Sequence, residues 1–115
     1  MNDNYKYEID RWLRTLSYIQ QENISMKNRL AELTHSKINK HLLKDAEYYQ
    51  TAFLNKDIII AFLRQDIFEF QNDGFSEGKK IERKTVLETD MRKMEQEFSK
   101  LKFDFNDFVS DYMTN

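Results

Sequence analysis

The sequence predicts an all-α protein, an antiparallel bundle of three long amphipathic helices with coiled-coil-like heptad seams. The 115 residues contain no proline and two glycines, whereas average usage would give about six and about eight, so interruptions of the helices are few. Apolar residues recur at alternating spacings of three and four along three tracts, and no stretch sustains the alternation of a β-strand. The hydrophobic fraction of 40% supports a packed core. Because this length suits one domain, we expect residues 1–115 to form a single helical domain.

The first helix is predicted over about residues 4–34. Its seam is apolar except at Asn23 and consists of Tyr5, Ile9, Trp12, Leu16, Ile19, Asn23, Met26, Leu30 and Leu33. Asn23 takes an a position of the heptad, where a buried amide favours pairing with a helix that offers another polar group. A solvated position in the seam is the alternative, and the sequence leaves both open.

The second helix is predicted over about residues 37–72, with the seam Leu42, Ala46, Tyr49, Phe53, Lys56, Ile60, Leu63, Ile67 and Phe70. At its end, Gly74 can supply a C′ glycine and Ser76 can cap the next helix. Its start is less clear, because the heptad phase slips between Leu33 and Leu42 and only Ser36 offers an N-cap. We expect a tight turn there, with one continuous helix of about 65 residues as the alternative.

The third helix is predicted over about residues 77–113. Phe103 falls off its seam, which consists of Lys84, Leu87, Met91, Met94, Phe98, Leu101, Phe105, Phe108 and Tyr112. The second and third helices both begin with cations and end with anions, against their macrodipoles. An antiparallel hairpin turns this mismatch into complementarity. It predicts that Lys40 and Lys44 lie near Asp104 to Asp111, and that Asp66 and Glu69 lie near Lys80 and Arg83.

The totals disfavour several functions. The formal charge of -2 lacks the positive field of most nucleic-acid-binding proteins, and the absence of cysteine removes disulfides and thiolate chemistry. The longest apolar run, residues 58–63, is far shorter than the roughly 20 residues that cross a bilayer. The first residues do not resemble a secretory signal. We therefore expect a cytoplasmic protein with no membrane contact.

Catalytic and metal-binding patterns are weak. Glu32 and His35 form one Glu-x-x-His, but a carboxylate di-iron site needs two such motifs and further glutamates. His41 and Asp45 are spaced for a surface ion pair, and no nucleophile or glycine-rich loop accompanies them. We expect no enzyme activity, no metal site and no cofactor.

The strongest functional signal is surplus apolar surface on the second helix. One seam cannot bury every residue between Ile58 and Leu63, so this helix is either central or covered by another chain. We predict a contact between copies through Tyr48, Ile58 and Phe62, with Asn23 as a polar register device if the first helix takes part. The predicted function is a non-enzymatic interaction or scaffold module that forms a homodimer or larger assembly and presents a surface to another protein.

The alternative prediction is a nucleic-acid-associated regulator. Lys79, Lys80, Arg83 and Lys84 bring four cations to the start of the third helix, where they could contact phosphates. Acidic residues of the second helix are expected to neutralise them, so nucleic acid is the less favoured partner.

Overall fold

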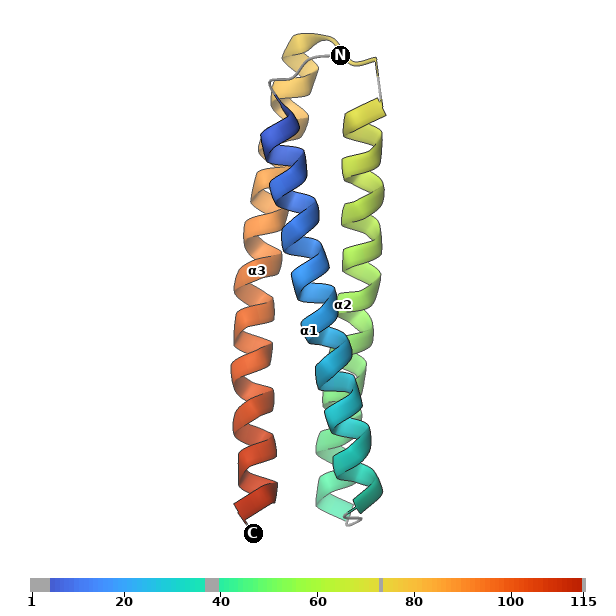
Figure 1. The fold of residues 1–115 in the computed structure, drawn as a ribbon, viewed down its shortest axis with the longest axis vertical. Helices are drawn as coiled ribbons and strands as arrows, with labels where there is room; N and C mark the ends of the chain where they lie inside the picture. Colours follow the sequence, from blue (N-terminus) through green and yellow to red (C-terminus); the bar gives the residue numbers. More distant parts are fainter. Residues whose placement is uncertain (1–4, 37–39, 73, 115) are drawn as a thin grey trace.

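The computed structural model describes residues 5–36, 40–72 and 74–114, which form three helices and contain no strand. The helices are α1 (Lys6–Ser36), α2 (Lys40–Asn72) and α3 (Glu77–Thr114). They pack side by side into a rod of 57 × 18 × 17 Å, in which α2 runs opposite to α1 and α3 (Figure 1). The predicted three-helix bundle is confirmed.

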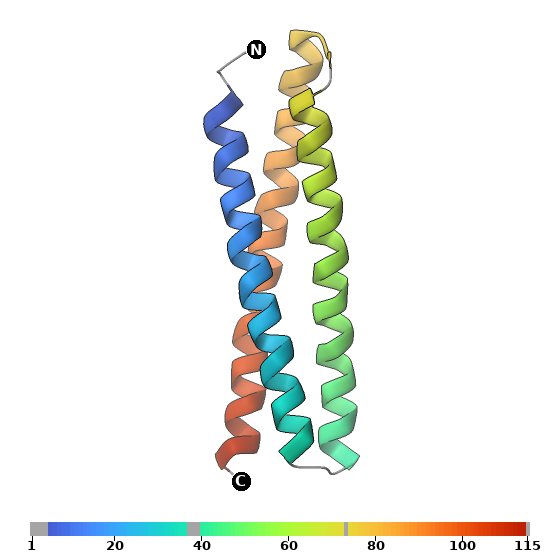
Figure 2. The ribbon, with the colours of Figure 1, turned by 45° about the vertical axis from the view of Figure 1, so that its right-hand side comes forward.

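The first two helices are joined between Ser36, the last helical residue of α1, and Lys40, the first of α2. The predicted role of the Ser36 side chain as N-cap of the second helix lies outside what the structure describes. Residues 37–39, which include the predicted start of that helix, lie outside the described residues. Because α1 and α2 lie antiparallel along their whole length, the single continuous helix is excluded (Figure 2).

Side chains donate hydrogen bonds to backbone carbonyls near the end of α2. Gly74 has no positive φ, so it does not supply the left-handed cap that its position suggested. Instead the Asn72 side chain donates to the Phe68 carbonyl at 2.9 Å, and the Lys80 ammonium of α3 donates to the Phe70 carbonyl. The Phe70 carbonyl belongs to the last turn of α2, where backbone acceptors lack helical partners.

The start of α3 is capped as the sequence predicted. Ser76 precedes the first helical residue, and its hydroxyl accepts a hydrogen bond from the Lys79 backbone N–H at 3.4 Å. Its carbonyl accepts the first helical bond, from the Lys80 N–H at 2.9 Å. This is the geometry of a serine N-cap.

The three predicted seams form one continuous core. Trp12, Phe53, Phe70 and Phe105 are fully buried, and aromatic pairs lie toward both ends of the rod. Trp12 and Phe70 have ring centroids 5.8 Å apart, and the Phe53 and Phe105 centroids are 5.0 Å apart at 82°. Such edge-to-face pairs add about 0.5–1.5 kcal/mol each to the gain from burial. Val109, which the predicted seam omits, is also buried.

The alignment of α2 with α3 differs from the one that the charges predicted. Tyr49 donates to the Asp104 carbonyl at 3.1 Å, and Tyr112 donates to Asp45 at 3.4 Å. Relative to the prediction, α3 is displaced by about one to two helical turns at this end. The Asp104 carboxylate pairs with Lys100 of its own helix at 3.1 Å.

Lys44 does not meet the acidic end of α3, because it lies beside Tyr48 and Thr51 on another face of α2. The predicted pairing of Lys44 with Asp104 to Asp111 is therefore wrong. Aromatic packing of Phe53 against Phe105 outweighs exposed ion pairs, which contribute about 0–1 kcal/mol each.

Two phenylalanines of α3 provide a test of this core. Phe105→Ala should lower the free energy of unfolding by about 3–5 kcal/mol, because it leaves a cavity among buried rings. Phe103→Ala, at a side chain that is 72% exposed, should change it little. Urea denaturation of both variants measures the difference, and equal losses would contradict the observed face of α3.

Candidate interaction surface

α2 carries a second heptad stripe that faces away from the core. It is exposed at every position and consists of His41, Lys44, Tyr48, Thr51, Asn55, Ile58, Phe62, Gln65 and Glu69, which we call the outer stripe. Tyr48, Ile58 and Phe62 are 66%, 54% and 67% exposed. Three of the four residues predicted for a contact between copies thus lie together on this stripe.

The fourth, Asn23, requires a correction. Its side chain is fully buried inside one chain, where its amide donates to the Phe53 carbonyl at 2.9 Å and to the Asp57 carboxylate at 2.8 Å. The solvated alternative is wrong, and so is a role for this amide between copies. A buried polar residue in the seam instead joins α1 to α2.

Asp57 extends this polar contact to the surface. Its second carboxylate oxygen pairs with Lys27 of α1 at 2.6 Å. The Asn23 side-chain oxygen is buried without a hydrogen-bond partner. Nearby along the same pair of helices, Arg64 donates to Ser17 at 3.2 Å and to Gln20 at 2.9 Å. These polar contacts therefore join α1 to α2 along the middle of the bundle.

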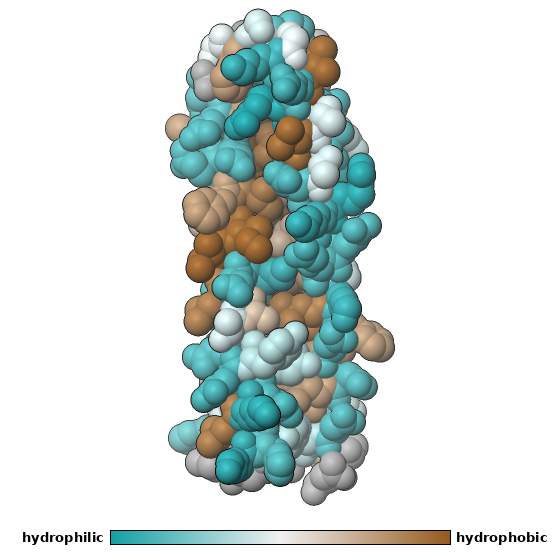
Figure 3. Space-filling model, turned by 180° about the vertical axis from the view of Figure 1, so that it is seen from behind, coloured by the Kyte–Doolittle hydropathy of each residue, from teal (hydrophilic) through white to brown (hydrophobic). Residues whose placement is uncertain are grey.

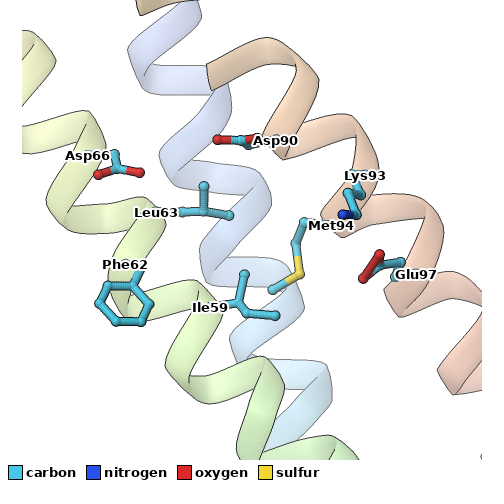
Figure 4. Close-up of a pocket in the computed structure, with 8 residues that line it drawn as sticks. All are labelled: Ile59, Phe62, Leu63, Asp66, Asp90, Lys93, Met94 and Glu97. Carbon is cyan, nitrogen blue, oxygen red and sulfur yellow. The ribbon is translucent and has the colours of Figure 1, made fainter. Parts of the chain in front are cut away.

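A hollow opens between α2 and α3 next to Phe62, and we call it the Phe62 hollow. Ile59, Leu63 and Met94 point into it from the two helices (Figure 4). Its volume is about 280 Å³, and its charged rim consists of Asp66, Asp90, Lys93 and Glu97. The result is an apolar floor surrounded by a mainly acidic edge.

A second hollow, the Tyr48 hollow, lies farther along the same two helices. Its volume is about 300 Å³, and Tyr48, Ala52 and Leu101 are among the residues that line it. Glu97 borders both hollows and pairs with Lys56 at 3.2 Å. Seen from behind, this face of the molecule shows apolar side chains gathered over α2 and between α2 and α3 (Figure 3).

Asp66, at the edge of the Phe62 hollow, is a carboxylate in an unfavourable setting. Burial raises the pKa of Asp66, and the negative charges of Glu69 and Asp90 raise it further, whereas Arg83 opposes them. The net pKa is higher than the ordinary value of 3.8. The folded chain therefore stabilises the protonated form of Asp66 relative to the charged form.

The basic start of α3 is largely engaged in contacts within the bundle. The Lys80 ammonium donates to the Phe70 carbonyl and lies 4.2 Å from the centroid of the Phe70 ring. Lys84 pairs with Glu8 of α1 at 3.4 Å and with Glu88 at 3.7 Å. One acidic partner of Lys84 therefore belongs to α1, whereas the sequence predicted acidic partners on the second helix.

Arg83 is half-buried beside Asp66, and its Nε is buried without a hydrogen-bond partner. Lys79 is exposed and lies 5.6 Å from the centroid of Phe75. Of the four cations predicted to contact phosphates, Lys79 is therefore exposed and the other three are half-buried.

Within the described residues, the fold does not bring the weak catalytic and metal-binding motifs of the sequence together into a site. Glu32 and His35 are both exposed, and the described residues include no group of three or more acidic or histidine side chains that could hold a metal ion. Asp45, which the sequence paired with His41, accepts the hydrogen bond from Tyr112. Within the described part of the chain, no helix is long and apolar enough to span a membrane.

Comparison of the chain with protein-family models, with curated proteins and with solved structures finds no match.

Two residues that join α1 to α2, and the two hollows, could not be predicted from the sequence. Asp57 and Arg64 flank the predicted seam, and their partners on α1 become visible only when the two helices are placed together. The two hollows depend on how far α2 and α3 are separated. No spacing in either helix encodes that distance, whereas the outer stripe could have been read in full from its spacing.

The Asn23 amide should contribute measurably to stability. Asn23→Ala removes two hydrogen bonds and should lower the free energy of unfolding by about 1–3 kcal/mol. Asn28→Ala, at an exposed position of the same helix, is the matched control and should have little effect. Urea denaturation checks both, and coinciding transitions would show that the buried amide adds nothing.

Asp66 should make stability depend on pH. Its raised pKa means that the folded state holds the proton more tightly, so this contribution is complete below pH 3.8 and is lost as pH rises through the folded pKa. Asp66→Asn should therefore melt at a higher temperature than the unmodified protein at pH 7, and the advantage should vanish near pH 3.

The control for that measurement is Asp10→Asn, a change at an exposed carboxylate of α1. Thermal unfolding of both variants is followed by circular dichroism at low protein concentration, so that association between copies does not contribute to the melting temperature. An advantage of Asp66→Asn that is the same at both pH values would contradict the burial of this carboxylate as its cause.

Proposed function

We propose that the protein is a non-enzymatic helical interaction or scaffold module that self-associates through the outer stripe of α2 and presents a surface to another protein. The observation that carries the proposal is the exposed apolar centre of this stripe. Ile58 and Phe62 lie one turn apart there, and Tyr48 lies on the same face. No charged residue interrupts the stripe between Tyr48 and Gln65.

The physical reason is the cost of leaving such a surface in water. Burial of apolar area is worth roughly 25 cal/mol per Å², and large exposed aromatic side chains are typical anchors of protein interfaces. Isolated exposed apolar residues are common and need no explanation. The outer stripe differs from isolated exposed residues, because its heptad spacing fits the side of another helix. α2 already buries one heptad stripe in the core and exposes this second one.

The hollows between α2 and α3 support the second half of the proposal. The Phe62 hollow offers an apolar floor to a side chain of another protein, and its acidic rim favours a partner with nearby basic residues. We propose a cytoplasmic location, which a chain without cysteine suits because that compartment is reducing.

Nucleic-acid binding receives less support. Lys80, Arg83 and Lys84 are partly buried and contact carbonyl, carboxylate or aromatic groups of their own chain. Weak retention on a heparin column at low salt is the expected outcome for the unmodified protein.

Light scattering at micromolar concentrations tests self-association. We expect a mass of twice the 14.0 kDa of one chain or more. Replacing Ile58 and Phe62 together by lysine should shift the protein toward the monomer while helicity is retained, because both side chains are exposed in a single chain.

The matched control replaces Ile81 and Phe103 of α3 by lysine, since these side chains are 56% and 72% exposed. This variant should keep the mass of the unmodified protein. A monomer of 14.0 kDa throughout the concentration range would refute self-association.

A further inference from the structure

We propose that the occupant of the outer stripe is the α2 helix of a second copy, packed antiparallel about a two-fold axis close to Asn55. This inference rests on the self-association proposed above. It adds a direction, a register and a centre, none of which follows from exposed apolar surface alone.

The first argument is the symmetry of the stripe about Asn55. Tyr48 lies seven residues before Asn55 and Phe62 lies seven residues after it, so each aromatic ring is about 10 Å from the centre along the helix. A two-fold axis at Asn55 therefore brings Tyr48 of each copy to the height of Phe62 in the other. The contact is isologous, because one patch meets the same patch.

The size of the neighbouring side chains follows the same symmetry. Ile58 lies three residues after Asn55, and the small side chain of Ala52 lies three residues before it. The two-fold axis brings Ile58 of each copy to the height of Ala52, which flanks the outer stripe, and of Thr51, which lies on it, and both side chains are smaller than that of Ile58. Asn55 itself meets its own copy, and its amide can both donate and accept a hydrogen bond there.

The hollows add room where the aromatic rings arrive. Phe62 of one copy comes to the level of the Tyr48 hollow of the other, which holds about 300 Å³. Tyr48 comes to the level of the Phe62 hollow, which holds about 280 Å³. The two hollows are similar in size, and the Tyr48 hollow extends along α2 as far as Asn55 itself.

Charge selects the antiparallel direction. His41 and Lys44 lie at the start of the outer stripe, and Glu69 lies at its end. An antiparallel pair places Lys44 near Gln65 and Glu69 of the other copy, whereas a parallel pair places Lys44 against Lys44 and Glu69 against Glu69. The antiparallel pair also sets the cationic start of each helix beside the negative end of its partner's macrodipole.

This arrangement favours a second copy over an unrelated protein. A different partner needs a complementary surface, but it does not need a stripe that is complementary to itself about one residue. The outer stripe has aromatic residues at equal distances on both sides of Asn55 and opposite charges at its two ends.

Disulfide cross-linking tests the axis, since the protein has no cysteine of its own. Asn55→Cys should cross-link under mild oxidation to a species of twice the 14.0 kDa of one chain. Lys44→Cys alone should not, because its two copies would lie about 33 Å apart along the helices, and a disulfide spans at most about 7 Å between Cα atoms. A mixture of Lys44→Cys and Gln65→Cys should form a mixed cross-linked dimer.

Phe103→Cys, on the exposed face of α3, is the control for random collisions and should stay uncross-linked. Light scattering of the same variants under reducing conditions reports association without the disulfide. A dimer in which Lys44→Cys cross-links readily to itself, or Asn55→Cys does not, would overturn the axis and leave self-association intact. A monomer would overturn both proposals.

Discussion

The narrow cross-section of the bundle determines most of its structure. In a rod of 57 × 18 × 17 Å, each helix can turn only one stripe of side chains toward the common core. Trp12, Phe53 and Phe105 fill that core, one from each helix. Apolar residues beyond one stripe per helix must stay on the surface, as Phe62 and Phe103 do. The exposed apolar surface is thus a geometric consequence of a slender fold, and on α2 the outer stripe carries Tyr48, Ile58 and Phe62.

Polar contacts then make the packing specific without supplying most of its stability. Asn23 replaces an apolar residue in the middle of the α1 seam and bonds to Phe53 and Asp57 of α2. Any slip between these helices would leave a buried amide unpaired, which costs more than a single hydrogen bond gains. At the C-terminal end of α2, the Lys80 ammonium of α3 donates to the Phe70 carbonyl, which has no partner within the helix. The three helices are in this way held at defined heights.

In our proposal, the protein functions through apolar side chains that the three-helix bundle leaves exposed. α2 buries one heptad stripe in the bundle and exposes another, and the exposed stripe combines apolar residues at its centre with opposite charges at its two ends. A helix with two such stripes can lie between two packing partners. The first partner is the rest of its own chain, and the second is the α2 helix of another copy.

The spacing of apolar residues by itself determined the three helices, their seams and the surplus on α2, because the 3.6-residue period of a helix is a local property. It also placed Tyr48, Ile58 and Phe62 away from the seam of the second helix, whereas their exposure became clear only from the packed bundle. Tertiary structure alone decided that Asn23 is buried within one chain and that Lys44 faces away from α3. Both depend on how helices are aligned with one another. That alignment is decided by close packing of large side chains across helices, which neither the charge pattern nor the heptad spacing of a single helix contains.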